Sequence, residues 1–465
     1  MSDPLSKMEL MGYNKPVLAV DNTEVMSVRA DWTDLLQSDR GRHESHIHNC
    51  EIALENAPAL AGKICLNAFT VQIETVGELP WDRSSLSGQI EDGDIIAFQA
   101  WLNRHGMKPS KETAFDAMVL VGQKNRFHPV QDYLKTVGSQ WDGIPRLETE
   151  LLDLMGVEKT GFTTAAMKRW MISAVARAMK PGCKVDTMVV LEGRQGARKS
   201  SLLAVLAVQP DWFLETLKPI AGDSKAAQEQ LPGKWIVEMA ELSTLKGSKA
   251  PQAKAFISTS TDNRRASYGK IAKDYPRACV FAGTTNEASW LQDSTGGRRF
   301  WPLAIGDQVD LDGIKAIVDQ LWAEAFNLYQ AGEQWWLTDD EEALAEKAQG
   351  SRRQRDELES VIAEYIDTII DHNKKAGQST LRIGRSDLKD HLALLGFASR
   401  GERQVMDGRI EKAIQTLPGR FTMLLGRKVV YGPGRENKSR KQDCWQALDQ
   451  EYVTEVLPPV SIEDY

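Results

Sequence analysis

The segment from Thr187 to Leu203 constrains the fold more than any other part of this chain. It reads as an apolar strand, a glycine-bearing loop and the start of an amphipathic helix, which is the order of a phosphate-binding loop. The pattern G-x-x-x-x-G-K-[ST] holds at Gly193, Lys199 and Ser200, and it departs at Arg198, where the pattern has glycine. The segment therefore predicts a site for a nucleotide phosphate, with one departure.

Each residue type in this loop suits a distinct contact with ATP and Mg²⁺. Backbone N–H groups surround the phosphates, Lys199 adds a point charge at the β and γ oxygens, and Ser200 offers a hydroxyl ligand to Mg²⁺. A bulky side chain at Arg198 must either tolerate the loop's backbone geometry or add a cation near the nucleotide, and the sequence leaves both open. The predicted nucleotide-binding residues are Gly193, Gln195, Gly196, Ala197, Arg198, Lys199, Ser200 and Ser201.

The pattern around this loop predicts an α/β fold. Near-continuous apolar strands at 188–191, 235–239 and 278–282 lie between helices, which favours a parallel sheet covered on both faces. A chain of 465 residues is long enough for about three domains. We expect a loosely ordered tail at 1–35, a helical domain at 36–135, a P-loop NTPase core at 136–345, a winged-helix-like domain at 346–445 and a C-terminal tail at 446–465.

The C-terminal part carries a dense run of positive charge. A helix at 357–372, a short strand at 379–384, helices at 386–395 and 401–417 and a hairpin at 421–431 follow the order of a winged helix-turn-helix. Residues 400–441 hold eleven Lys and Arg against four Asp and Glu. Winged helices bind DNA or proteins, and the sequence leaves both possibilities open.

Polar side chains that suit nucleotide hydrolysis follow the loop in order. Glu238 and Glu241 come at the end of an apolar strand, where one carboxylate can hold Mg²⁺ together with Ser200 and the other can orient the attacking water. Asn286 ends the next strand and can sense the γ-phosphate. The paired guanidinium groups of Arg298 and Arg299 suit stabilisation of charge on a transferring phosphoryl group. The predicted catalytic residues are Lys199, Glu238, Glu241, Asn286, Arg298 and Arg299.

A second basic block lies between Glu241 and Asn286, and the net charge of −8 hides it. A basic loop that projects from an ATPase sheet can neutralise the phosphates of a nucleic acid and stack on its bases, whereas the plain alternative is a solvated charged face. The predicted DNA-binding residues are Lys254, Arg264, Arg265, Tyr268, Lys270 and Lys273.

Composition indicates a cytoplasmic protein. The five cysteines form no CxxC pair and are odd in number, which is typical of a reducing compartment. The N-terminus lacks the apolar region of a signal peptide, and no apolar run approaches about 20 residues. We therefore expect no membrane association.

With these motifs, the chain resembles the virulence-associated E family of phage and prophage proteins, which is related to superfamily 3 helicases and primase-helicases. The resemblance covers about 125–305 well, and the C-terminal part matches only in outline. The segments that carry it are 128–134, 141–147, 191–200, 233–242, 274–277, 281–286 and 293–302.

The resemblance implies an AAA+-like ATPase core in a homo-hexameric ring, which uses ATP and Mg²⁺ to translocate on or unwind DNA during phage-type replication. Carried over by position, Lys199 and Ser200 are Walker A, Glu238 and Glu241 are Walker B, and Asn286 is sensor 1. Arg298 and Arg299 are then arginine-finger candidates from a neighbouring subunit. Phage or host replication proteins are the implied protein partners.

Two other functions compete with a DNA-dependent ATPase of helicase type. One is a DNA-binding initiator or regulator whose degraded nucleotide site serves only assembly, which Arg198 and the spacing of Glu238 and Glu241 support. The other is a small-molecule kinase with the same phosphate loop, which the C-terminal pattern and the basic block argue against. ATP turnover with and without DNA separates these hypotheses.

Overall fold

The computed structural model describes residues 32–83, 88–217, 224–240, 249–265, 271–287, 290–291, 297–352, 357–375, 382–395, 410–411, 413–414, 421–430 and 439–447. Contacts divide the chain into two units. The larger unit comprises Met1–Leu291 and Gly296–Arg352, and the smaller one comprises Gln292–Thr295 and Arg353–Tyr465. The finer domain limits expected from the sequence stay predictions.

The N-terminal part of the larger unit combines helices with a small sheet that the sequence did not predict. The helices pack around one hydrophobic core that includes Phe98, Leu102 and Met118, all fully buried. The helices are η1 (Trp32–Leu35), α2 (Ile47–Asn56), α3 (Asp92–Arg104) and α4 (Lys111–Lys124). The strands are β1 (Ser38–Asp39), which pairs with β2 (Arg42–His43), and β3 (Ile64–Asn67), which lies between β4 (Gln72–Thr75) and β5 (Arg126–Phe127).

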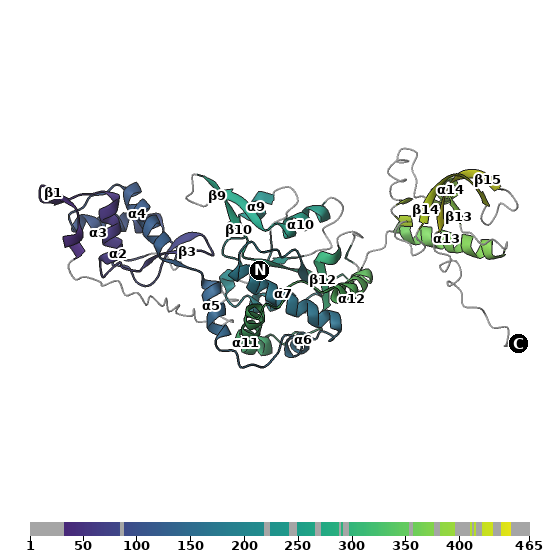
Figure 1. The fold of residues 1–465 in the computed structure, drawn as a ribbon, viewed down its shortest axis with the longest axis horizontal. Helices are drawn as coiled ribbons and strands as arrows, with labels where there is room; N and C mark the ends of the chain where they lie inside the picture. The colour runs from purple at the N-terminus through teal and green to yellow at the C-terminus, as the bar shows by residue number, and fades with distance from the viewer. Residues whose placement is uncertain are drawn as a thin grey trace. The chain divides into compact units, whose positions relative to one another are not determined.

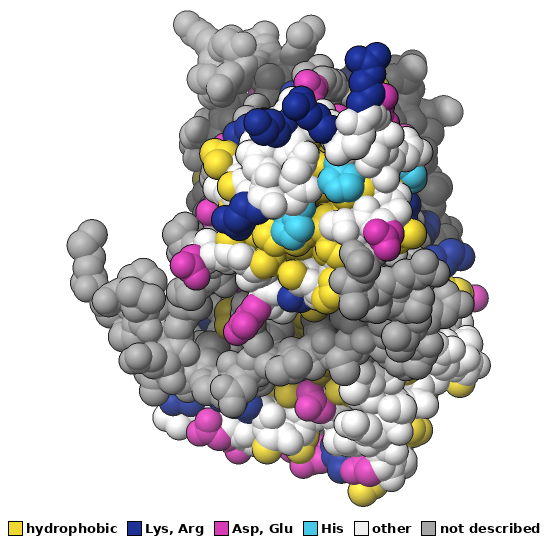
Figure 2. All heavy atoms as spheres, turned by 90° about the vertical axis from the view of Figure 1, so that its left-hand side faces the viewer, with side chains coloured by type: hydrophobic (Ala, Val, Ile, Leu, Met, Phe, Trp, Pro, Cys, Tyr) yellow, Lys and Arg dark blue, Asp and Glu magenta, His cyan; other side chains and the backbone are white. Residues whose placement is uncertain are grey.

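The face of the molecule seen in Figure 2 is mixed in character. Lys and Arg, Asp and Glu, and His side chains are interspersed there with hydrophobic ones. A backbone-binding surface for nucleic acid needs positive charge gathered on one face or along one element. Among the described residues drawn there, charges of both signs lie on the same face.

A five-stranded parallel sheet forms the centre of the larger unit, in the order β12-β6-β11-β8-β7. Every residue of β6, β8 and β11 is buried, so these strands are the near-continuous apolar runs that a doubly covered sheet requires. The structure confirms the mixed α/β fold and the three predicted strands. The strands are β6 (Met188–Glu192), β7 (Phe213–Leu214), β8 (Ile236–Met239), β11 (Val280–Thr285) and β12 (Phe300–Ala304).

Helices cover both faces of this sheet (Figure 1). Alternate residues of β6 point to opposite sides, so Val189 and Leu191 join one core cluster while Met188 and Val190 join another. The first cluster is built with α5 (Pro129–Gly138), α6 (Glu150–Met155), α7 (Gly161–Met179), α8 (Lys199–Leu206), α11 (Leu311–Gln330) and α12 (Asp339–Gly350). The second is built with α9 (Ser224–Gln228) and α10 (Lys249–Ser258).

An antiparallel hairpin interrupts the chain between α10 and β11. It consists of β9 (Thr261–Arg265) and β10 (Ala272–Pro276), and its register places Arg264 opposite Lys273. The residues that join its strands, 266–270, lie outside the described part of the chain. The second basic block of the sequence therefore includes a two-stranded ribbon.

The smaller unit contains α13 (Glu357–Lys375), α14 (Arg385–Leu394) and a three-stranded antiparallel sheet in the order β13-β15-β14. The strands are β13 (Arg382–Gly384), β14 (Phe421–Val430) and β15 (Ser439–Ala447).

One prediction for this unit is wrong. The expected hairpin at 421–431 is a single strand, β14, which pairs with β15 and has an irregular register between Leu424 and Arg427. Gly426 looks like a turn residue in the sequence, but a register irregularity accommodates it within the strand. Arg427 and Lys428 thus lie on a paired strand. Most of the helix expected at 401–417 falls outside the described residues.

Helix length and polarity bear on membrane association. Within the described ranges, no helix is both long and apolar enough to cross a bilayer.

Candidate nucleotide site

The loop between β6 and α8 takes left-handed backbone at two residues. Gly196 has φ of 86°, and Arg198 has φ of 65° and ψ of 29°. This conformation is open to glycine but costs another L-residue about 1–2 kcal/mol. Arg198 therefore adopts the backbone that glycine would take at this place in the pattern, and its side chain is exposed. Arginine in place of glycine at position 198 therefore changes the side chain but not the backbone conformation of the loop.

Lys199, the first residue of α8, is held by three neutral oxygen atoms. Its Nζ donates to the carbonyls of Gly193 (2.8 Å) and Arg194 (2.9 Å) and to Oδ1 of Asn286 (2.6 Å). Burial lowers the pKa of Lys199, because the charged form loses solvation, while Glu238 opposes that shift. None of the three acceptors carries a charge that neutralises the ammonium group.

Glu238 lies in β8, beside the start of α8. Its Oε1 accepts hydrogen bonds from Ser200 Oγ (2.8 Å) and Thr284 Oγ1 (2.7 Å). Its Oε2 is buried without a hydrogen-bond partner among the described residues. Burial raises the pKa of Glu238, and the two hydroxyl donors oppose the rise.

The strand order explains why these side chains meet. β11 lies between β6 and β8, so Asn286 and Thr284 come between the loop that follows β6 and the carboxylate of β8. Carboxyl ends of parallel strands share one edge of a sheet, where ligands bind in open α/β folds. The sequence predicted Lys199, Ser200, Glu238 and Asn286. It missed Thr284, although a hydroxyl within an otherwise apolar buried strand was the available signal.

The donor set fits Mg²⁺. Mg²⁺ takes oxygen ligands and is usually held by one or two protein groups together with substrate phosphates and waters. Ser200 and Glu238 bring a hydroxyl and a carboxylate together, and Oε2 of Glu238 is the orphaned buried atom that a cation would satisfy. No cluster of three or more His, Cys, Asp or Glu residues suits a metal within the described ranges, so an all-protein metal cage is absent there.

The predicted arginines lie away from this edge of the same chain. Arg298 and Arg299 directly precede β12, whose residue Phe300 pairs with Met188 at the amino end of β6. Arg298 is exposed, whereas Nε of Arg299 donates to Oγ of Ser258 (2.9 Å). They therefore lie at the sheet edge opposite the phosphate loop. Glu241 falls outside the described residues.

The basic block divides into buried and exposed members. Lys254 is buried in α10, which is contrary to the expected surface position. The guanidinium of Arg264 stacks on Tyr275, 4.2 Å from the ring centroid, and burial lowers the pKa of Arg264. Lys273 is exposed on β10. Arg265 is described only as a residue of β9, and Tyr268 and Lys270 lie outside the described residues.

Comparison with known proteins identifies the domain that carries this site. The class is a mixed α/β protein with a parallel sheet and a loop site at its carboxyl edge. Residues 134–354 match the model of the virulence-associated protein E-like domain. This part of the chain is therefore similar to the virulence-associated protein E-like domain, which confirms the predicted resemblance.

Matches to solved structures are distant. The C-terminal region of NrS-1, in its apo form, is 14% identical over 64% of this chain and 75% of that one, with a TM-score of 0.39. The SCCmec type IV protein Cch, titled an active helicase, is 12% identical over 70% of each chain, with a TM-score of 0.28. No curated protein matches the sequence significantly.

Proposed function

We propose that this chain is a DNA-stimulated ATP hydrolase of helicase type that works in phage or prophage replication. The observation that carries the proposal is the convergence of Lys199, Ser200, Glu238 and Asn286 at one edge of the parallel sheet. The virulence-associated protein E-like domain spans all four residues. Their chemistry matches the binding and hydrolysis of a nucleoside triphosphate.

In the proposed reaction, Lys199 exchanges neutral acceptors for phosphate oxygens. Its three present partners hold the loop together without cancelling its charge, so an anionic phosphate competes well for the ammonium group. Asn286, released from Lys199, can then hydrogen-bond the γ-phosphate or the attacking water. The N–H groups at the start of α8 add positive potential.

Ser200 and Glu238 would hold Mg²⁺, which supplies charge neutralisation on the phosphates when bound. Ser200 already donates to Glu238, so the two oxygens lie on one side of the loop. Either Glu238 or Glu241 would orient the attacking water.

Assembly into a homo-hexamer would give Arg298 and Arg299 a role. They lie at the sheet edge opposite their own phosphate loop, so only a neighbouring copy of the chain could use them at its nucleotide. Arg298 is exposed and free to reach such a neighbour, whereas Arg299 is bound to Ser258. We therefore assign the arginine finger to Arg298 before Arg299.

DNA contact is assigned first to the β9–β10 ribbon. Arg264 and Lys273 face each other across it, and the stacked pair of Arg264 and Tyr275 offers a charge beside an aromatic ring. The winged-helix-like arrangement expected of the smaller unit is a second candidate for DNA binding.

The test is ATP hydrolysis by the full chain, with and without single-stranded DNA. We expect turnover that rises with DNA and is lost in Lys199→Ala. Lys234→Ala is the matched control, because Lys234 Nζ also donates to two carbonyls, of Asp211 (2.8 Å) and Phe213 (3.1 Å), but lies outside the site. Absence of turnover by the wild type under both conditions would contradict the proposal and favour an assembly-only nucleotide site.

A further inference from the structure

A second buried carboxylate adjoins the phosphate loop without a part in the proposed reaction. Glu192 is the last residue of β6, directly before Gly193, and is 8% exposed. Its Oε1 accepts from Nε1 of Trp290 (2.7 Å). The Arg352 guanidinium donates to both carboxylate oxygens, with Nε at 3.1 and 3.0 Å and Nη2 at 3.0 Å from Oε2. Both oxygens are therefore bound by groups from other segments.

Trp290 and Arg352 lie at the two places where the chain passes from the larger unit to the smaller one. The larger unit is interrupted after Leu291 and ends at Arg352. The N–H of Leu291 also donates to the carbonyl of Arg352 (3.1 Å). Both limits of the larger unit are therefore tied to each other and to Glu192.

Glu192 is connected to the nucleotide site through its neighbours. Gly193 follows it directly and accepts a hydrogen bond from Lys199 through its carbonyl (2.8 Å). Trp290 follows Asn286, the side-chain acceptor of Lys199, by four residues. A displacement of Arg352 or Trp290 therefore acts on the segments that carry two of the three acceptors of Lys199.

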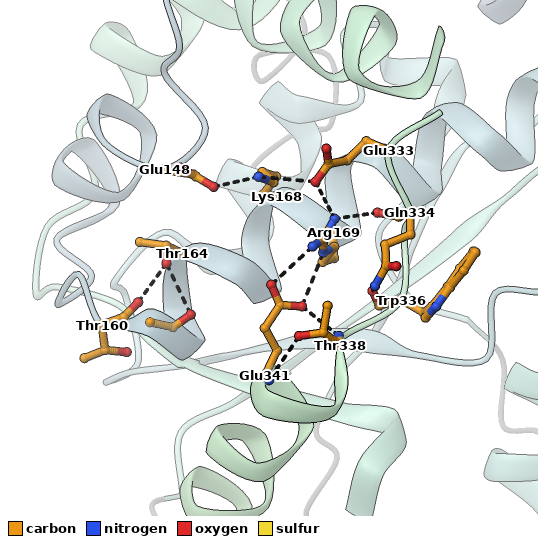
Figure 3. A network of polar contacts seen from close by, with 11 residues as sticks. Glu148, Thr160, Thr164, Lys168, Arg169, Glu333, Gln334, Trp336, Thr338 and Glu341 are labelled. Carbon is orange, nitrogen blue, oxygen red and sulfur yellow. Dashed lines mark hydrogen bonds and ion pairs between the residues drawn. The ribbon is translucent and has the colours of Figure 1, made fainter. Parts of the chain in front are cut away.

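The helix that precedes Arg352 is fixed at its far end. α12 begins with a capping box between Thr338 and Glu341. Arg169 of α7 binds Glu341 (3.2 Å) and Glu333 (2.7 Å), as Figure 3 shows. The side chain of Arg169 is only 7% exposed, so the centre of this anchor is buried, while Glu333 and Glu341 are partly exposed. The start of α12 is therefore held by contacts that do not involve Arg352 or Glu192.

We propose that Glu192 is a positioning residue of the phosphate loop, and that its ion pair with Arg352 couples DNA bound by the smaller unit, the second candidate for DNA contact, to ATP hydrolysis. The inference rests on the proposed ATP hydrolysis. Coupling here means that DNA bound by the chain alters the nucleotide site through the contact between Arg352 and Glu192.

The test compares wild type and Arg352→Gln as full chains in two assays. One is the stimulation of ATP turnover by single-stranded DNA, and the other is the affinity for a fluorescent ATP analogue with and without DNA. We expect Arg352→Gln to lower the DNA effect about five-fold or more in both, since coupling between sites typically spans this range. Trp290→Phe, which removes one of the donors, should have a smaller effect in the same direction.

Two variants separate coupling from stability. Removing one partner of a buried ion pair leaves the other unpaired, so Arg352→Gln should lower the melting temperature, and adding Glu192→Gln should recover part of it. The double variant should still lack the DNA effect. Glu341→Gln weakens the other end of α12 and keeps its capping side chain, so it should retain the DNA effect.

An unchanged DNA effect in Arg352→Gln would overturn the inference, as would an equal loss in Glu341→Gln. The analogue assay needs no hydrolysis. A wild type that binds the analogue but never turns over ATP would therefore contradict the proposed function, while the effect of DNA on analogue affinity still decides the coupling.

Discussion

Glu238 and Asp262 are both buried carboxylates, at 1% and 4% exposure, but their surroundings differ in kind. Both oxygens of Asp262 are bound by the Arg277 guanidinium at 2.7 Å, and Arg277 also donates to the carbonyl of Phe256 and stacks on its ring. Glu238 has only two neutral hydroxyl donors on Oε1 and none among the described residues on Oε2. Asp262 is hydrogen-bonded to a cation on both oxygens, whereas Glu238 has Lys199 as a nearby charge but no hydrogen bond to a cation among the described residues.

This difference separates an ion that is paired within the fold from the ions that we propose bind a ligand. A buried charge that is paired within the chain is costly to leave without its partner and has little left to offer a ligand. A buried charge without a counterion is unfavourable until a ligand of opposite sign arrives, which is typical of functional sites. Lys199 resembles Glu238 in this respect, because neutral oxygens hold it. Arg277, which the sequence placed in a basic block, belongs with Asp262.

The largest expected effect is on stability, at Asp262. Asp262→Asn leaves the guanidinium of Arg277 buried without a counterion, and we expect the free energy of unfolding to fall by about 3–5 kcal/mol. Urea denaturation followed by fluorescence measures the change. The exposed pair of Lys111 and Asp92 is the control, since Asp92→Asn should change stability by less than about 1 kcal/mol. A loss of similar size in both variants would contradict the distinction.

At Glu238 we expect a substitution to lower activity and not stability. Glu238→Gln removes a buried charge that the fold does not neutralise, so stability at pH 7 should be maintained or increased. ATP turnover should fall about 100- to 1000-fold, which is typical of losing one electrostatic group at a reaction site. Steady-state turnover and thermal melting together measure both effects.

The pH dependence tests the same point. The pKa of Glu238 is raised in the folded state, so ionisation opposes folding as pH rises above the value for the unfolded chain. The gain in stability from Glu238→Gln should therefore shrink as pH falls towards about 4.5 and both forms become neutral. A variant that is less stable than wild type at pH 7 would contradict the assignment of Glu238 as an unmatched charge.

Sequence reasoning found the edge of the sheet but not the state of each charge. Lys199, Ser200, Glu238 and Asn286 follow or end apolar strands, and strand alternation with a parallel sheet brings such positions together. The pairing of Asp262 with Arg277 joins residues 15 apart across a hairpin, so local charge density could not reveal it.

Three further outcomes show the same limit. The burial of Lys254 depends on how α10 packs, which spacing alone does not give. The contact between Glu192 and Arg352 spans 160 positions. The turn expected at Gly426 was wrong because a β-strand with an irregular register and a tight hairpin share the same local glycine signal.

A third prediction concerns His128, another buried titratable group that the fold has satisfied. Burial lowers its pKa from 6.5 to about 4, and Nδ1 accepts the N–H of Gln131 at the start of α5 (3.3 Å). The unfolded chain binds more protons than the folded one between these two values, so stability present at pH 7 is lost as pH falls. We expect a loss of about 2 kcal/mol between pH 7 and pH 5 from this residue.

His128→Asn is the variant that isolates this effect, since asparagine caps helices well and does not titrate. Denaturation midpoints at pH 7 and pH 5 measure the stability of both proteins. The variant should lose less stability than wild type over this range. Equal losses would mean that His128 is charged in the folded protein at pH 5. His128 would then not be a buried group whose state the fold has fixed, as Asp262 is.

The smallest expected effect is at Arg198. Its backbone shapes the loop, and its charged side chain is available to a ligand. Arg198→Gly relieves a left-handed backbone worth about 1–2 kcal/mol. It also adds freedom to the unfolded chain worth about 0.4–1 kcal/mol, so stability should rise by less than about 2 kcal/mol. The Arg198 side chain is exposed beside the loop, and it forms no ion pair with an acid among the described residues. Like Lys199, Arg198 is therefore a cation without a hydrogen-bonded acid, and we expect its charge to attract a bound phosphate. The KM for ATP should therefore rise about two- to five-fold in the variant, measured by steady-state kinetics at low salt, and the difference should shrink as salt is added. An unchanged KM would assign Arg198 to the backbone alone.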